Sequence, residues 1–174
     1  MDTFHIPVGE MTITPNDAQL ISGLSMAGKA VRGKDYVNEL EWHKIYAFTK
    51  NVFGWDEDKT KSEMLVGQAK QRMFHLESLR DQFMGTKKLC DQGKEVTTER
   101  ITATTHLYLL YVLGIVIFPD ISDAGVKANY IKLLDLIHKM ANYSWGSAIL
   151  ENLLNELRKY SRHEPAEGIC VLCR

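Results

Sequence analysis

The apolar run Leu107–Phe118 constrains the fold of this chain more than any other segment, because it places twelve consecutive uncharged residues, LYLLYVLGIVIF, in one stretch. A helix that crosses a membrane needs about 20 predominantly apolar residues, so this run is too short for a membrane span. Together with the residues from Thr98 onward, it predicts a helix whose second half is apolar on nearly every side. Such a helix belongs at the centre of a helical bundle, and we expect no membrane partner.

Helical periodicity recurs on both sides of this run. Apolar residues spaced three and four apart predict further helices over Tyr36–Phe53, Met64–Met84 and Tyr130–Met140, and a final helix that begins at Ser144. The charged stretch Gly85–Val96 is instead predicted to form a solvated loop.

The N-terminal segment departs from this helical pattern. Two short β-prone stretches, Phe4–Pro7 and Glu10–Thr14, lie on either side of Val8-Gly9 and predict a small hairpin. The length of 174 residues and the hydrophobic content of 45% suit one globular domain with a sizeable core. We therefore predict a mainly α fold, a single-domain helical bundle over residues 1–174 with a short N-terminal β-hairpin.

A helix is expected directly after the hairpin. Thr14 suits the N-cap position, Pro15 the first helical position, and Asp17 the third, where an acidic side chain can bond back to the cap. The apolar residues that follow this start signal are Ala18, Leu20, Ile21 and Leu24.

Charge gives little support to a nucleic-acid-binding protein. The chain has 21 basic and 22 acidic side chains and a net charge of −1, whereas nucleic-acid-binding domains are usually basic. A local cluster is the alternative, and its candidate contacts are Lys87, Lys88, Lys94 and Arg100. Acidic residues alternate with this cluster and should weaken its attraction for phosphate.

The cysteines do not define a metal site. Only Cys90, Cys170 and Cys173 are present, an odd number in a chain too long to need disulfides, so we expect reduced thiols. Cys170 and Cys173 supply at most half of a tetrahedral zinc site, and His75 lies far away in the sequence within a predicted helix. We therefore predict no metal.

No catalytic motif is recognisable. Gly23–Ala30 approaches a phosphate-binding loop, but Ala30 stands where a Ser or Thr would hold magnesium, and the segment follows a predicted helix where a strand is required. The segment is better explained as a helix stop followed by a turn. We predict that the chain is not an enzyme and binds no cofactor or small-molecule substrate; a hydrolase or transferase would instead require a polar cleft with convergent titratable groups.

The segment Tyr143–Ser147, with the sequence YSWGS, is the most distinctive motif. Ser144 suits a helix N-cap, and Gly146 early in a helix permits another backbone to approach closely. The large ring of Trp145 is expected to pack back on the bundle, and the same ring type also anchors protein interfaces. Both roles stay open at this point.

These motifs together resemble the plant mobile domain family. The resemblance rests on the opening Thr3–Thr14 with Asp17 and Gly23-Leu24, and on the second half of the chain. In that half the matching segments are Tyr108–Gly114, Phe118-Pro119-Asp120, Tyr130, Leu133-Leu134 and Tyr143–Ala148. Family members continue into another apolar helix after the position of Ile169, so the resemblance predicts a domain truncated at its C-terminal helix.

The resemblance implies a function as well as a fold. The family occurs in plant transposable elements and in host proteins of the maintenance-of-meristems group, which act in nuclei in transposon silencing, genome stability and meristem maintenance with a phosphoprotein phosphatase. We therefore expect a nuclear, non-catalytic protein-interaction module with such a partner. The signature residues expected to serve interaction or structure are Gly9, Glu10, Tyr143, Ser144, Trp145 and Gly146. The alternative is a nucleic-acid-binding accessory domain of a transposase.

Overall fold

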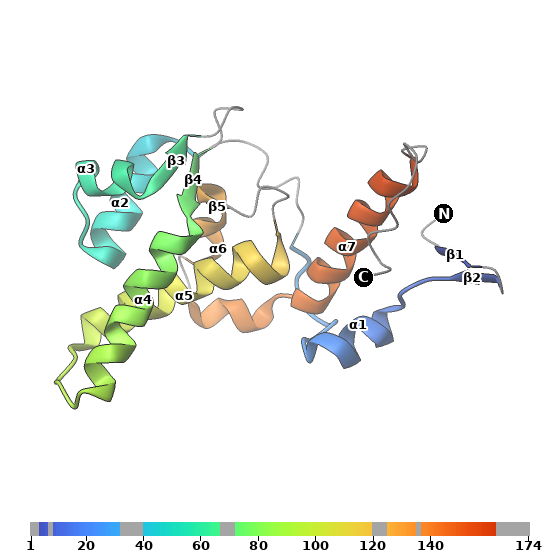
Figure 1. Ribbon diagram of the computed structural model, residues 1–174, viewed down its shortest axis with the longest axis horizontal. Helices are drawn as coiled ribbons and strands as arrows, with labels where there is room; N and C mark the ends of the chain where they lie inside the picture. Colours follow the sequence, from blue (N-terminus) through green and yellow to red (C-terminus); the bar gives the residue numbers. More distant parts are fainter. Residues whose placement is uncertain are drawn as a thin grey trace. The chain divides into compact units, whose positions relative to one another are not determined.

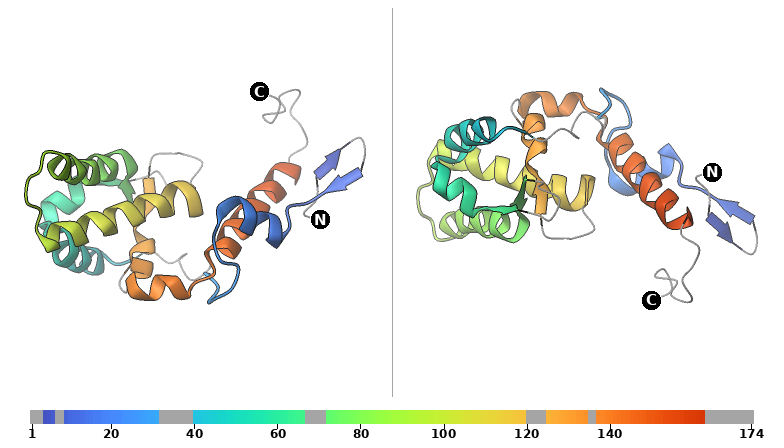
Figure 2. Two further views of the ribbon diagram at one scale, coloured as in Figure 1. Left: turned by 90° about the horizontal axis from the view of Figure 1, so that it is seen from below. Right: turned by 90° about the horizontal axis from the view of Figure 1, so that it is seen from above.

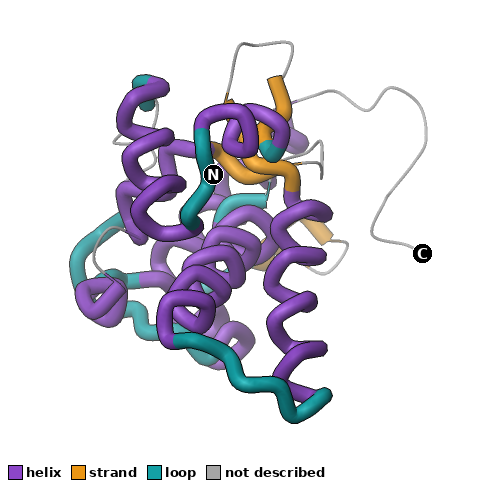
Figure 3. The backbone as a smooth tube through the Cα atoms, turned by 90° about the vertical axis from the view of Figure 1, so that its left-hand side faces the viewer, coloured by secondary structure: helices purple, strands orange, loops and turns teal. Residues whose placement is uncertain are grey.

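The structure of the chain is a computed structural model that describes residues 4–6, 9–31, 40–66, 72–119, 125–134 and 137–162. Helix is the main secondary structure, as the sequence predicts, and the strands are short (Figures 1 and 3). The chain divides into two compact units. Residues 1–30 and 144–174 form the first, and residues 31–143 form the second.

The first unit contains the predicted hairpin and two helices. Strands β1 (Phe4–Ile6) and β2 (Gly9–Met11) pair antiparallel, with His5 opposite Glu10. Helix α1 (Pro15–Ser22) follows and packs against α7 (Trp145–Arg162), from the other end of the sequence (Figure 2). The predicted hairpin and the final helix are therefore confirmed, although Val8 lies outside the described residues.

The start of α1 is the capping box that its sequence predicts. The backbone N–H of Asp17 donates to the Thr14 hydroxyl at 3.2 Å, and the Thr14 backbone N–H donates to the Asp17 carboxylate at 2.9 Å. These two bonds satisfy backbone groups that would otherwise lack a helical partner. The helix ends at Gly23, whose φ of +68° lies in the left-handed region that glycine adopts without strain.

The second unit is helical with one small sheet. Its α-helices are α2 (Trp42–Phe53), α3 (Glu57–Ser62), α4 (Leu76–Asp91), α5 (Thr98–Val112) and α6 (Ile131–Leu134), and its π- and 3₁₀-helices are η2 (Leu113–Ile117), η3 (Ala128–Tyr130) and η4 (Ile137–Asn142). Its strands are β3 (Met64–Val66), β4 (Arg72–His75) and β5 (Gly125–Lys127), paired antiparallel in the order β3-β4-β5.

The apolar run lies in α5 and η2, so the predicted helix is present, but it is buried on one side only. Leu113 and Ile117 lie in the core, whereas Ile115 and Val116 are 44% and 50% exposed, so the prediction that the second half is buried at the centre of a bundle is wrong for its outer side. Leu110 is fully buried, and Gly114 approaches β5 so closely that an added Cβ atom would lie 2.7 Å from the Cβ of Val126. In the described part of the chain, Thr98–Ile117 is the one helical stretch whose length and composition would suit a membrane span, a test that a core helix of a soluble protein also passes.

The prediction of one helix over Met64–Met84 is wrong at its beginning. Residues 64–66 and 72–75 are strands, and the helix begins only at Leu76. The spacing of Met73, Leu76 and Leu79 resembles a helical stripe, and strands of three and four residues are too short to show a clear alternation. The partner strand β5 lies about 50 residues later in the sequence, so the pairing that stabilises β4 leaves no local signal.

Three other predicted segments also differ from the structure. The predicted loop Gly85–Val96 is helical up to Asp91, because Thr86 is buried and Leu89 half-buried on one face of α4. The predicted helix Tyr130–Met140 is instead split among the end of η3, α6 and η4. Residues 36–39 of the predicted helix Tyr36–Phe53 lie outside the described residues. From Leu40 onward the helix α2 begins only at Trp42, and the Leu40 N–H donates instead to the buried Asn129 side chain at 2.8 Å.

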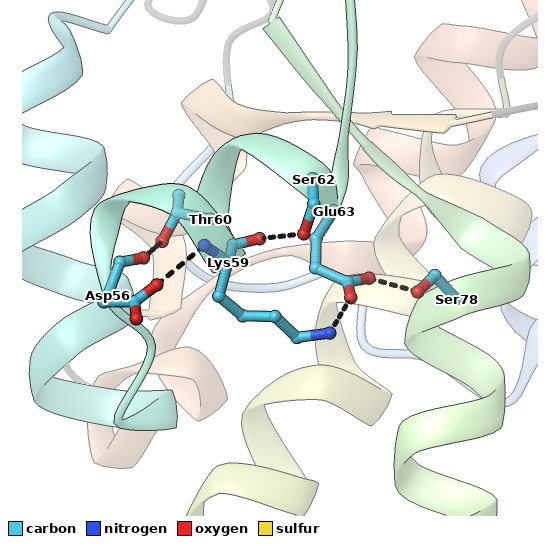
Figure 4. A network of polar contacts seen from close by, with 6 residues as sticks. All are labelled: Asp56, Lys59, Thr60, Ser62, Glu63 and Ser78. Carbon is cyan, nitrogen blue, oxygen red and sulfur yellow. Dashed lines mark hydrogen bonds and ion pairs between the residues drawn. The ribbon is translucent and has the colours of Figure 1, made fainter.

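Buried polar contacts connect the small elements of the second unit. The Glu63 carboxylate, 6% exposed, accepts hydrogen bonds from Lys59 and Ser78 and so joins the end of α3 to α4 (Figure 4). The hydroxyls of Thr49 and Thr60, both fully buried, lie 2.7 Å apart and join α2 to α3. These contacts satisfy polar groups whose burial would otherwise be costly.

Candidate interaction site

The signature motif binds the loop that follows α1. The Ser144 hydroxyl donates to the carbonyl of Met26 at 3.1 Å, and its backbone N–H donates to the carbonyl of Lys29 at 3.0 Å. The Gly146 N–H donates to the carbonyl of Ser25 at 3.0 Å, and the Ser147 hydroxyl reaches Met26 at 3.3 Å. The beginning of α7 thus satisfies three carbonyls of an irregular loop.

Gly146 is the point of closest approach. It is buried, and a Cβ atom at this position would lie 2.5 Å from the sulfur of Met26 and 2.9 Å from the carbonyl oxygen of Leu24. No side chain fits here without movement of the loop backbone. The predicted close approach at Gly146 is therefore present, and the segment that approaches belongs to the same unit.

The structure of this loop shows what the segment Gly23–Ala30, which approaches a phosphate-binding motif in sequence, forms in the fold. Gly23 ends α1, and the Ser25 hydroxyl closes a local turn with Ala27. The carbonyls of Ser25, Met26 and Lys29 accept hydrogen bonds from the α7 start. This arrangement is the helix stop and turn that the sequence predicts.

The other signature residues lie in different environments. Tyr143 and Trp145 are half-buried, on either side of the buried Ser144. Gly9 and Glu10 lie in β2, opposite Ile6 and His5. The contacts of Ser144 and Gly146 described above are with the loop after α1 and not with this hairpin, so an interaction role for all six residues stays a prediction.

Helix α1 exposes a pair of neighbouring apolar side chains. Leu20 and Ile21 are 83% and 82% exposed, whereas Ala18 is the buried residue of this helix. Sequence reasoning missed this feature, because an apolar residue at helical spacing looks the same whether the core or a partner covers it. The other positions of α1 carry few apolar residues, and this was the one feature of the sequence that could have indicated an exposed pair.

The predicted basic cluster is split between a helix end and a loop. Lys87 and Lys88 lie in the last turns of α4, Lys94 lies in the following loop, and all three are exposed. Arg100 lies in α5, and its Nε donates to the hydroxyl of Thr86 at 3.1 Å. That bond uses part of the Arg100 guanidinium to hold α4 and α5 together, and so lowers its availability to a ligand.

A groove with a volume of about 830 Å³, lined by both polar and apolar residues, also lies beside this α4–α5 contact. Its lining includes Asp81, Glu99 and Arg100, which are titratable. In the described part of the chain, no hydrogen bond joins a hydroxyl or thiol in this groove to a carboxylate or histidine that could act as its base.

The described residues contain no group of three or more His, Cys, Asp and Glu side chains that could hold a metal ion. His75 lies at the end of β4 and not within a helix, and its Nδ1 is buried. Cys170 and Cys173 lie outside the described residues, so the absence of a metal there stays a prediction.

Comparison with known proteins places these observations in a family. Over 98% of its length the chain is 28% identical to Protein MAINTENANCE OF MERISTEMS of Arabidopsis thaliana, and over 90% it is 29% identical to Protein MAIN-LIKE 2 of the same plant. It is also 29% identical, over 92% of its length, to an Arabidopsis thaliana Serine/threonine-protein phosphatase 7 long form homolog.

The matched regions cover 32%, 20% and 10% of these three relatives, so the chain spans a third of their length or less. No solved structure matches the chain. The Plant mobile domain family matches residues 1–173, almost the whole sequence. The chain belongs to the plant mobile domain family.

Proposed function

We propose that this chain is a non-catalytic protein-interaction module and that α1 carries its contact surface. The observation behind this proposal is the pair Leu20 and Ile21, each more than four-fifths exposed on a capped, regular helix. Two neighbouring aliphatic side chains in water favour association, because a partner that covers them removes apolar surface from solvent. The half-buried ring of Trp145 in the same unit provides a candidate second anchor.

The proposed partner is a phosphoprotein phosphatase in the nucleus. One relative is named as a phosphatase 7 long form homolog, so a domain of this type occurs in the same chain as a phosphatase. Of two other relatives, one is named for meristem maintenance and the second is named after the first, which supports a role in meristem maintenance. Roles in genome stability and transposon silencing are proposed on the family resemblance alone. The occurrence of such a domain in a chain with that name is the basis for proposing a phosphatase as the partner of this chain.

A direct binding experiment tests this proposal. The purified chain is titrated with the purified catalytic domain of a plant phosphatase 7 type enzyme by calorimetry. Leu20→Ser combined with Ile21→Ser should weaken binding about 30-fold or more, the effect expected when hot-spot residues are lost. Phosphatase turnover is measured in parallel, and the chain alone should show none.

A matched variant separates loss of the surface from general loss of apolar groups. Ile101→Ser alters a 52%-exposed aliphatic residue on α5, in the other unit, and should leave affinity unchanged. Circular dichroism confirms that each variant is folded. Undiminished binding by the double variant would show that α1 is not the contact surface, and absence of binding by the wild type would refute the partner class.

The alternative is a nucleic-acid-binding accessory domain of a transposase. It is favoured by the exposed lysines Lys87, Lys88 and Lys94 around the end of α4. Phosphate contacts release counterions, so affinity for DNA should fall steeply as salt rises, and Lys87→Gln with Lys88→Gln should flatten that dependence. The exposed Lys61→Gln in α3 is the matched control. No DNA binding at low salt would eliminate this alternative.

A further inference from the structure

A separate cavity of about 440 Å³ lies within the second unit, lined by residues of α2, α5 and α6. Its volume falls in the range of small-molecule sites, about 300–1,000 Å³. Phe48, Val52 and Ile131 supply apolar surface. None of these residues belongs to the α1 surface proposed above.

His106 is a buried polar group at this cavity. The residue is 8% exposed, and its Nδ1 lies 2.8 Å from the carbonyl oxygen of Thr102. Because a carbonyl only accepts, Nδ1 carries the proton in this bond, which makes Nε2 the second hydrogen-bonding position of the ring. In the described part of the chain no hydrogen bond joins Nε2 to another residue, so it is available to a ligand in the cavity.

The charges at the cavity have one sign. Lys44 and Lys132 both line it and both are exposed, and the described lining residues include no carboxylate. Lys44 lies 3.6 Å from Glu41, but both side chains are more than half exposed. Such a solvent-exposed pair is weak, so it leaves the ammonium group available to a competing anion.

We propose that this cavity binds a small organic anion. A carboxylate or phosphate group would lie between Lys44 and Lys132, and an attached apolar body would pack against Phe48 and Ile131. A protonated oxygen of a phosphate monoester would also donate a hydrogen bond to Nε2 of His106, which accepts. Charge-assisted hydrogen bonds hold the anionic group, and burial of the apolar body supplies the rest of the affinity. The site requires no metal and no covalent step.

Titration of the intact chain with phenyl phosphate, followed by NMR, tests this assignment. Saturable shifts should appear for residues that line the cavity, including the His106 ring signal. Phenylacetate should shift the same signals, whereas benzyl alcohol, which has the ring without the charge, should bind at least about tenfold more weakly, a difference of about 1.4 kcal/mol. A phosphotyrosine peptide distinguishes the two sources of the anion. If the peptide binds more tightly than phenyl phosphate, the natural ligand is a phosphorylated protein side chain. If the peptide does not bind, the natural ligand is a free small molecule.

Three variants locate the binding site. Lys44→Gln and Lys132→Gln change exposed residues and should each weaken phenyl phosphate binding about tenfold. Lys50→Gln removes the same charge from α2 outside this cavity and should have no effect. His106→Asn keeps a donor for the Thr102 carbonyl while it removes Nε2, and should weaken binding as well. Equal affinity for benzyl alcohol, or binding that neither lysine substitution affects, would overturn the proposal.

Discussion

Gly146 shows how a single residue of the signature acts through backbone contact. Its N–H donates to the carbonyl of Ser25, and the space for a Cβ atom is occupied by Met26 and the Leu24 carbonyl. The sulfur of Met26 can move, whereas a backbone carbonyl held in a hydrogen-bonded loop moves only with the loop. The glycine is therefore required by packing, whether or not the neighbouring surface binds a partner.

Gly146→Ala should lower the free energy of unfolding by about 1–3 kcal/mol, because the added methyl group overpacks the contact between α7 and the loop. Gly85→Ala is the matched control, since Gly85 lies within α4 with no atom within 4 Å of its Cβ position. It should stabilise the chain by up to about 1 kcal/mol through helix propensity. Urea unfolding of both variants provides the comparison, and equal effects of the two substitutions would contradict the packing explanation.

At the scale of the element, α1 depends on its cap more than on its packing. It is a helix of eight residues with one buried side chain, Ala18, so tertiary contact provides little of its stability. The hydrogen bonds from the Thr14 hydroxyl and, secondly, from its backbone N–H lower the pKa of the Asp17 carboxyl below its usual value of 3.8. The charged form of Asp17 therefore stabilises the folded helix.

The lowered pKa of Asp17 gives this helix a pH dependence. Because the folded value is lower than the unfolded one, the stabilisation is complete above about pH 4 and is lost as pH falls through the folded pKa. Asp17→Asn should reduce the acid sensitivity of α1, while Asp58→Asn, at an exposed position in α3, should leave it unchanged. The stability of α1 as a function of pH is measured by hydrogen exchange of its backbone amides, from near neutral pH down to about 3. An identical pH profile for Asp17→Asn and the wild type would refute the role of the cap.

At the scale of the whole molecule, the number of cooperative domains is the main question. The structure divides into two compact units, and the sequence predicts a single domain. In the first unit the described apolar core residues are Ala18, Ala148 and Leu150, a small set for a unit that would fold by itself. We propose that residues 1–174 unfold as one domain.

Calorimetry of the whole chain should therefore show one heat-absorption peak, with equal calorimetric and van't Hoff enthalpies. In Gly146→Ala that single peak should move to lower temperature as a whole. Two resolved peaks, of which Gly146→Ala shifts only one, would show instead that the units are separate domains.

The sequence by itself determined the features whose causes are local. These features are the hairpin, the Thr14–Asp17 cap and the helix stop at Gly23. Each depends on residues close together along the chain, so each can be predicted without tertiary information. The helix that contains most of Leu107–Phe118 is similarly determined, because apolar residues favour burial from water, whereas the tertiary structure decides which side of it is covered. The close approach at Gly146 was also predictable, because a glycine in the first turn of a helix lowers helix propensity and leaves room for another backbone.

Only the tertiary structure decided the features that depend on distant partners. Pairing of β4 with β5 joins residues about 50 positions apart, and Leu40 leaves the predicted helix because it bonds Asn129. Three other features also depend on residues far apart in the sequence. They are the loop that packs on Gly146, the exposure of Leu20 and Ile21, and the cavity beside His106. Periodicity in the sequence indicates which face of a helix is apolar. Only the packing of the folded chain decides whether that face is buried within the chain or left exposed to a partner.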